Sequence, residues 1–164
     1  MEIEVGAMHL DEADALAELA RLIWHAHYPA IISPAQIDYM LGQRYKPGLI
    51  RQTLARGDRW DVARAGIELV GFAHACMVTD SDYKLDKLYV HPDWQRHGIG
   101  ARLLARVVTH ARDHACNRLI LRVNRQNTQA IAAYLKYGFE VATLIVEDIG
   151  AGFLMDDYVM IKEI

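Results

Sequence analysis

The spacing of apolar residues changes near residue 59, and this change limits the folds that the chain can adopt. Before it, apolar residues recur every three or four positions, as Leu16, Leu19 and Ile23 do, which is typical of helices. After it, runs such as 59–65 and 68–78 carry the β-branched and aromatic residues typical of strands. A helical first part followed by strands and helices in alternation indicates the α/β class.

Residues that typically begin or end helices and strands mark the boundaries of the predicted elements. Ser33-Pro34-Ala35-Gln36 has the form of a capping box with proline at the first helical position, and Gly138 ends the last helix. The predicted strands are 2–6, 59–65, 68–78, 84–90, 118–123, 139–147 and 157–162, and the predicted helices are 11–28, 34–44, 47–56, 101–114 and 127–137. No repeat or linker interrupts this order. We therefore predict one domain over residues 1–164, with a mixed sheet of about seven strands and helices on both faces.

Composition excludes several classes of protein. A formal net charge of −3 over 164 residues argues against a general nucleic-acid binder. No apolar run approaches the ~20 residues of a membrane span, and the first residues lack the pattern of a signal peptide. The two cysteines, Cys76 and Cys116, belong to no paired motif, which suits a reducing compartment. We expect a cytoplasmic protein that binds neither nucleic acid nor membrane.

The segment from Leu88 to Ala101 predicts a strand, a loop with two glycines and the start of a helix. Unpaired backbone N–H groups in such a loop, together with the positive end of the helix, form a site for phosphate. Gly98 and Gly100 would allow close approach and unusual φ angles. Further positive charge would come from Arg96, Arg102 and Arg106. A loop of this kind can also be only a tight turn, and the dinucleotide and Walker patterns are absent.

A second motif follows at the expected distance. It reads Asn127-x-x-Ala130-x-x-x-Tyr134-x-x-x-Gly138-Phe139, downstream of a strand ending Leu88-Tyr89-Val90-x-Pro92 and of Gln95-x-x-Gly98-x-Gly100. In residue types, order and spacing the chain resembles the GNAT superfamily of N-acetyltransferases over about residues 68–164. The resemblance implies a mostly antiparallel sheet in a single domain. It further implies that 68–164 form the acetyl-CoA-binding core and that 1–67 form a helical region on the acceptor side.

The resemblance also implies roles for individual residues. Backbone groups of Leu88, Tyr89 and Val90 would meet the thioester and the pantetheine arm where that strand splays from 118–123. Asn127, with Ala130 beside it in the motif, would hydrogen-bond the pantetheine, and Tyr134 would be the general acid near the sulfur. By spacing alone, Tyr134 could equally be a core aromatic. The pyrophosphate would be held by Gln95, Arg96, His97, Gly98, Ile99, Gly100 and Ala101.

The expected reaction is direct attack of an amine on the thioester. An alkylamine has a pKa of about 10.4, so neutralising it at about pH 7 costs roughly 4–5 kcal/mol and favours a base. Some relatives place a glutamate where this chain has Arg122, so the base is unassigned. Asp86 is the first candidate, because it lies two residues before Leu88 and would share its face of the strand. Asp86 could equally well form an ion pair with a neighbouring cation and have no catalytic role. His74 is the alternative candidate for the base.

The acceptor is predicted to be a small cationic amine, because aromatic and acidic side chains occur in the segments that shape the acceptor cleft in this family. These residues are Trp24, Tyr28, Ile32, Tyr39, Tyr83, Phe153, Asp156 and Asp157. The same residues could instead form a hydrophobic staple and a solvated turn. A protein lysine or N-terminal acceptor, or a non-catalytic CoA-binding module, remain alternatives.

No resident metal is expected. His25 with His27 and His110 with His114 have metal-like spacings, but no carboxylate or cysteine accompanies them. Both cysteines are expected to be small core residues. The expected partners are acetyl-CoA and an amine acceptor, and a homodimer is left open.

Overall fold

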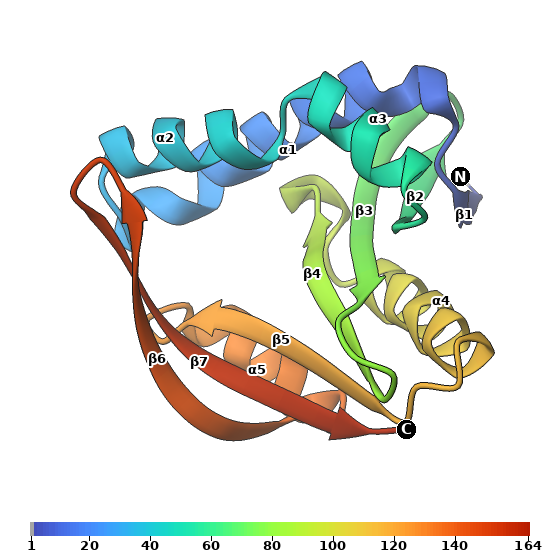
Figure 1. Ribbon diagram of the computed structural model, residues 1–164. Coiled ribbons are helices and arrows are strands. Elements are labelled where there is room, and N and C mark those ends of the chain that lie inside the picture. Colours follow the sequence, from blue (N-terminus) through green and yellow to red (C-terminus); the bar gives the residue numbers. More distant parts are fainter. Residues whose placement is uncertain (1) are drawn as a thin grey trace.

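Seven strands form one sheet in the order β1-β2-β3-β4-β5-β7-β6 in the computed structural model, which describes residues 2–164 (Figure 1). Neighbouring strands are antiparallel except β4 and β5, which run parallel. The strands are β1 (Ile3–Ala7), β2 (Arg59–Ala65), β3 (Glu68–Met77), β4 (Asp82–Val90), β5 (Arg118–Asn124), β6 (Glu140–Gly150) and β7 (Phe153–Glu163). The helices are α1 (Ala13–His27), α2 (Pro34–Arg44), α3 (Pro47–Ala55), α4 (Ile99–Asp113) and α5 (Thr128–Lys136). The predicted fold class and strand number are confirmed.

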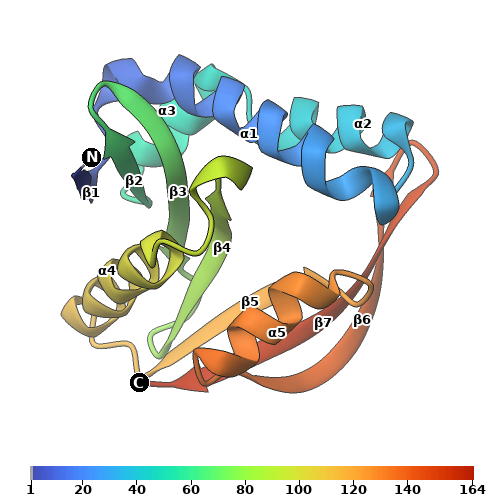
Figure 2. The same ribbon diagram turned by 180° about the vertical axis from the view of Figure 1, so that it is seen from behind.

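Helices cover both faces of the sheet, as predicted, and each face has its own core. On one face the apolar stripe of α1, including Leu16 and Ile23, packs with α2, α3 and Phe72. On the other face Leu103 and Val107 of α4 pack against β-strand residues, and α5 adds partly buried residues to the same cluster (Figure 2). Within residues 2–164 no helix is both long enough and apolar enough to cross a bilayer.

Strands β4 and β5 pair only at their first residues and then separate. Their register runs from Asp82 opposite Arg118 to Lys84 opposite Ile120, and the ribbons diverge beyond that point (Figure 1). Each strand keeps an antiparallel partner on its outer side, β3 and β7 respectively. Beyond these first residues, the inner edges of both strands find no strand partner within residues 2–164, and the predicted splay is confirmed.

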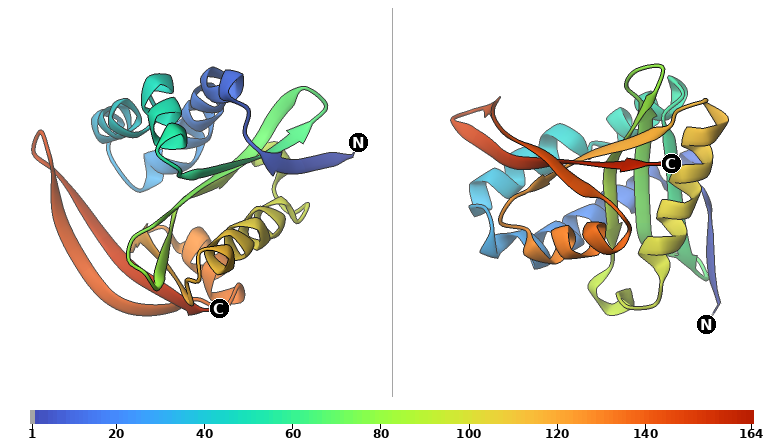
Figure 3. Two further views of the ribbon diagram at one scale, coloured as in Figure 1. Left: turned by 45° about the vertical axis from the view of Figure 1, so that its right-hand side comes forward. Right: turned by 90° about the horizontal axis from the view of Figure 1, so that it is seen from below.

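The β6–β7 hairpin reaches across to α2 and closes one side of this opening (Figure 3). Tyr39 of α2 donates a hydrogen bond to the Ile149 carbonyl at 2.7 Å, and its ring lies 5.2 Å from that of Phe153. Ser33 caps α2 as predicted, accepting from the Gln36 amide at 3.1 Å. The reciprocal half of the predicted capping box is wrong, because the Gln36 side chain donates instead to the Leu154 carbonyl at 2.9 Å.

Candidate active site

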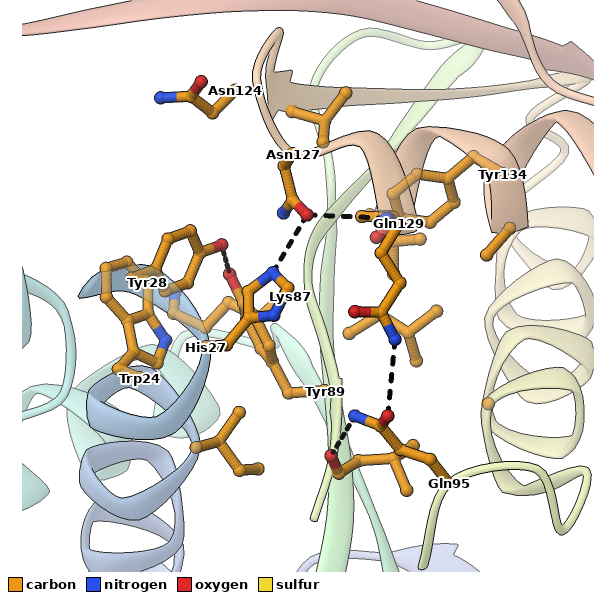
Figure 4. A pocket seen from close by; sticks show the side chains of 18 of the residues that line it. Trp24, His27, Tyr28, Lys87, Tyr89, Gln95, Asn124, Asn127, Gln129 and Tyr134 are labelled. Carbon is orange, nitrogen blue, oxygen red and sulfur yellow. Dashed lines mark hydrogen bonds between the residues drawn. The ribbon is translucent and has the colours of Figure 1, made fainter. Parts of the chain in front are cut away.

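A cavity of about 520 Å³ occupies the opening between β4 and β5. Its lining comes from both faces of the sheet, with Tyr28 and Tyr89 from one core and Ala130 and Tyr134 from the other (Figure 4). Most of the predicted site residues lie on its wall: Asp86, Leu88, Tyr89, Val90, Gln95, Arg96, Gly98, Ile99, Gly100, Asn127, Ala130 and Tyr134. His97 and Ala101 do not line it, and both are exposed. A ring nitrogen of His97 lies 2.9 Å from the Gln95 carbonyl oxygen, so this side chain is used to hold the loop.

One end of the cavity, which we call the loop end, is formed by Gln95, Arg96, Gly98, Ile99 and Gly100. The backbone N–H groups of residues 96–101 find no acceptor within residues 2–164, and the first amide bond of α4 is that of Arg102 to the Gly98 carbonyl at 3.1 Å. A row of free donors at the positive end of a helix is a binding site for an anion. The loop end can therefore hold a phosphate group.

The two glycines of the loop end serve different purposes. Gly98 adopts a left-handed conformation with φ of 74°, as predicted, and a Cβ built there would meet nothing within 4 Å. The prediction of an unusual φ at Gly100 is wrong. A Cβ at Gly100 would lie 3.3 Å from the Tyr137 hydroxyl, so close packing between α4 and Tyr137 is what disfavours a side chain there.

Asn127 forms the N-cap of α5 and also connects that helix to α1. Its side-chain oxygen accepts from the Ala130 amide at 3.4 Å and lies 2.9 Å from Nε2 of His27 (Figure 4). A second contact lies on one wall of the cavity, where the hydroxyls of Tyr28 and Tyr89 lie 2.8 Å apart. Sequence reasoning missed His27, because the contact spans 100 positions and no local pattern signals it.

Tyr134 projects into the cavity from α5, in the same motif as Asn127. Its ring packs edge to face against Phe139, 5.6 Å between centroids, so the residue is also part of the core. Burial raises the pKa of the Tyr134 hydroxyl, with the charges of Tyr28 and Tyr137 as lesser causes. A hydroxyl with a raised pKa stays protonated at neutral pH, which is the state a proton donor needs.

The argument that placed Asp86 on the same face as Leu88 is wrong. The register of β3 and β4 shifts between His74 and Ala75, and Asp86 is left without a partner on β3, as in a β-bulge. Leu88 packs on the core under α4, whereas Lys87 lies 5.4 Å from the centre of the Trp60 ring, in the other core. Asp86 lies 3.2 Å from His74, whose ring stacks on Trp60 in that other core, and Asp86 therefore faces the α1–α3 side.

The carboxylate of Asp86 is occupied by neighbouring groups. Lys87 donates to it at 2.5 Å, Lys84 lies 3.1 Å away and His74 3.2 Å away. Burial alone would raise the pKa of Asp86, but the His74 hydrogen bond and the two lysine charges outweigh burial and hold it far below its usual range. His74 is itself bound to Asp58 at 2.6 Å and is almost fully buried. Both candidate bases therefore sit in an ion-paired network, and such a strongly acidic carboxyl group is a weak base.

The opposite end of the cavity, which we call the charged end, is formed by Arg44, Asp86, Lys87, Arg122 and Asp157. Asp157 of β7 is 1% exposed, and its Oδ2 lies 3.3 Å from Nε of Arg122 without forming a hydrogen bond. Burial raises the pKa of Asp157, against the lesser opposing effects of Arg122 and Arg44. Asp157 is thus the carboxylate on the wall whose surroundings make it a better proton acceptor than an ordinary aspartate.

Other predicted contributors lie elsewhere. Tyr83 belongs to the core on the α4 face, and Tyr39 and Phe153 join α2 to the hairpin. Arg106 does not add charge to the loop end, because it pairs with buried Asp61 at 3.0 Å. Within residues 2–164 no three histidine, cysteine or acidic side chains gather as metal ligands would.

Known proteins share this architecture along their whole length. The structure of PaiA N-acetyltransferase from Thermoplasma acidophilum in complex with coenzyme A superposes with a TM-score of 0.86 at 25% identity, covering 100% of both chains. The fold is also that of YncA from Salmonella typhimurium, solved with acetyl-CoA, at a TM-score of 0.71, 18% identity and coverage of 99% and 94%.

Sequence comparison agrees with the structural comparison. A spermidine N(1)-acetyltransferase of Thermoplasma acidophilum is 27% identical over 162 residues, 95% of this chain and 97% of that protein. An uncharacterized N-acetyltransferase of Mycobacterium tuberculosis strain H37Rv is 29% identical over 156 residues, 94% and 99% of the two chains. The model of the Acetyltransferase (GNAT) family matches residues 15–139. Fold, cavity, motifs and relatives agree, and the chain belongs to the GNAT family of N-acetyltransferases.

Proposed function

We propose that this enzyme transfers the acetyl group of acetyl-CoA to the primary amine of a small acceptor, by direct attack of the amine on the thioester. The observation that carries the proposal is the layout of one continuous cavity. Free amides of residues 96–101 stand at its loop end, and side-chain charges stand at its charged end. Relatives solved with coenzyme A or acetyl-CoA support the choice of cosubstrate.

The loop end suits the pyrophosphate, and the unpaired edges of β4 and β5 suit the pantetheine arm. Beyond Lys84 the inner edge of β4 has no strand partner in the part of the chain that the structure describes, so backbone groups of Leu88, Tyr89 and Val90 are available to amide groups of the arm. The same backbone N–H groups would stabilise negative charge that develops on the carbonyl oxygen. Asn127, already fixed by His27 and the start of α5, would complete the contacts to the arm.

Two side chains would handle protons. The ammonium form of the acceptor first loses one proton to Asp157, which passes it to solvent. As the new C–N bond forms, the amine nitrogen loses a second proton to Asp157, and as the C–S bond breaks, the thiolate takes one from Tyr134. Asp157 replaces Asp86 in this role because its pKa is raised by burial, whereas that of Asp86 is held low. Solvent then restores the proton of Tyr134 and removes that of Asp157.

A small acceptor is favoured because the β6–β7 hairpin and α2 together close one side of the cavity. Hydrogen bonds from Tyr39 to Ile149 and from Gln36 to Leu154 close the hairpin over α2. An open groove, which a protein lysine or N-terminus would need, is less compatible with this cover. The acceptor would enter as an ammonium cation and meet Asp157, and the similarity to a spermidine acetyltransferase supports a small amine. We place the reaction in the cytoplasm, where the free thiols of Cys76 and Cys116 would stay reduced.

The test is a screen of small amines and lysine-containing peptides with acetyl-CoA, detecting free CoA. We expect turnover with small amines and little with peptides. Turnover with peptides alone would favour the protein-acceptor alternative. Tight acetyl-CoA binding without turnover of any amine would point to a non-catalytic CoA-binding module.

A further inference from the structure

We infer that the acceptor amine also carries a carboxylate, and that Arg44 is the residue that binds it. The inference rests on the proposed function and specifies the chemical class of its acceptor: an amino acid, not a polyamine. It comes from an imbalance of charge at the charged end of the cavity.

Cations outnumber carboxylates there. The cations are Arg44, Lys84, Lys87 and Arg122, and the carboxylates are Asp86 and Asp157. Lys84 and Lys87 both pair with Asp86, at 3.1 and 2.5 Å. Arg122 lies 3.3 Å from Asp157 and also pairs with the half-exposed Glu147. Both carboxylates on the wall are thus already matched by cations of the protein.

Arg44 is the cation left over. Within residues 2–164 no carboxylate oxygen lies within 4.0 Å of its guanidinium, and its one hydrogen bond, from Nη2, goes to the Met155 sulfur at 3.1 Å. A thioether is a weak acceptor. Arg44 is partly buried, so its charge has lost some hydration without gaining a direct ion pair to any carboxylate of residues 2–164. An anionic group on the ligand would supply the missing partner.

The space beside Arg44 suits a carboxylate. A recess of about 40 Å³ opens between Arg44, Lys84, Arg122, Asp86 and Met155, next to the main cavity. A planar guanidinium binds a carboxylate through two parallel hydrogen bonds, which gives both affinity and orientation. With its carboxylate on Arg44, the acceptor would direct its amine toward Asp157. A second ammonium group, as in a diamine, would instead meet the unmatched charge of Arg44.

The experiment compares matched amines that differ only in the carboxylate: L-alanine and ethylamine, L-phenylalanine and phenethylamine, and L-lysine and cadaverine, with spermidine added. The measurement is kcat/KM for free CoA release, with calorimetry of the same amines in the presence of CoA. We expect the carboxylated member of at least one pair to be preferred by about 10- to 100-fold, the range of a charge-assisted bidentate bond.

Arg44→Glu should reverse that preference, lowering kcat/KM for the amino acid by roughly 100-fold or more and raising it for the diamine. Lys46→Glu is the matched control, because Lys46 is exposed and changes the net charge equally. Arg44→Gln, which removes charge without reversing it, is the second variant, and unchanged acetyl-CoA affinity shows that each variant is folded.

Preference for cadaverine or spermidine in the wild type, unaltered in Arg44→Glu, would overturn the inference and leave the proposed function standing. Failure of every amine to be acetylated or bound would overturn both.

Discussion

The two ends of the cavity are built in different ways. The loop end comes from consecutive residues, and its binding groups are backbone amides fixed by the start of α4. The charged end comes from side chains of α2, β4, β5 and β7, whose residues lie far apart in the sequence. A site whose binding groups are backbone amides tolerates most changes of side chain, but it does not tolerate an added bulky or negatively charged side chain. A site made of side-chain charges can change its ligand through one substitution.

The largest effect is expected from placing a negative side chain at the loop end. Gly98→Glu should weaken acetyl-CoA binding by roughly 100-fold or more, because its carboxylate would compete for the amides that hold the phosphate. Gly98→Ala is the control. It adds a Cβ that meets nothing within 4 Å, so it should cost about 1–2 kcal/mol of stability for the left-handed φ while affinity stays within a few-fold. If calorimetry showed that the glutamate variant binds acetyl-CoA as tightly as the wild type does, the loop would be only a turn and not a phosphate-binding site.

The next effect concerns the carboxylate of the charged end. Asp157→Asn should lower kcat/KM by about 100- to 10,000-fold, the usual contribution of a general base. Asp157 must be ionised to accept a proton, and burial raises its pKa. As the pH is lowered, wild-type activity should therefore begin to fall at a pH above the pKa of an ordinary aspartate. The variant should not show this fall in activity at low pH. An unchanged pH–kcat/KM profile in the variant would remove Asp157 from the mechanism.

Tyr134 lies between the two ends. Tyr134→Phe removes only the hydroxyl, so stability and acetyl-CoA affinity should hardly change while kcat falls by roughly 10- to 1,000-fold. The loss should shrink at high pH, where the thiolate no longer needs a proton. Single-turnover kinetics over a range of pH would measure this. Equal kcat in the variant and the wild type would assign Tyr134 to core packing with Phe139.

The smallest effect on catalysis is expected at Asp86. Asp86→Asn should keep kcat/KM of the folded enzyme within about tenfold but lower the free energy of unfolding by roughly 3 kcal/mol at about pH 7, because Lys87 loses its buried partner. The folded-state pKa of Asp86 lies below its unfolded value, so its stabilisation is present above about pH 4 and is lost as the pH falls through the folded pKa. Urea unfolding should therefore show that the free energies of unfolding of the wild type and the variant become more similar as the pH is lowered. A collapse of activity in a stable variant would restore Asp86 as the base.

The difference between the loop end and the charged end also explains which parts of the site could be predicted from the sequence. The loop end was predictable because spacing along one strand, loop and helix determines which backbone groups lie together, as Gly98 illustrates. The charged end was not, because its geometry depends on irregularities and long-range contacts. The bulge at Asp86 reversed the parity of its strand, and no pattern in the sequence marks that position.

Long-range contacts account for the other differences. The pair of His27 and Asn127 joins helices that are distant in the chain, and Arg106 turned away from the loop end toward Asp61. Arg44 is an ordinary residue at the end of a helix until the fold places it on the cavity wall with no ion pair to an acidic side chain of the described residues. Only the tertiary arrangement reveals which charges are already matched.

Transfer of a labelled acetyl group tests the central claim most directly. The enzyme is incubated with deuterated acetyl-CoA and the preferred amine from the panel, and the products are measured by mass spectrometry. Direct attack predicts one N-acetylated, deuterated amine for each CoA released and no label on the protein. Release of CoA with deuterated acetate alone, or accumulation of label on the enzyme, would contradict the account.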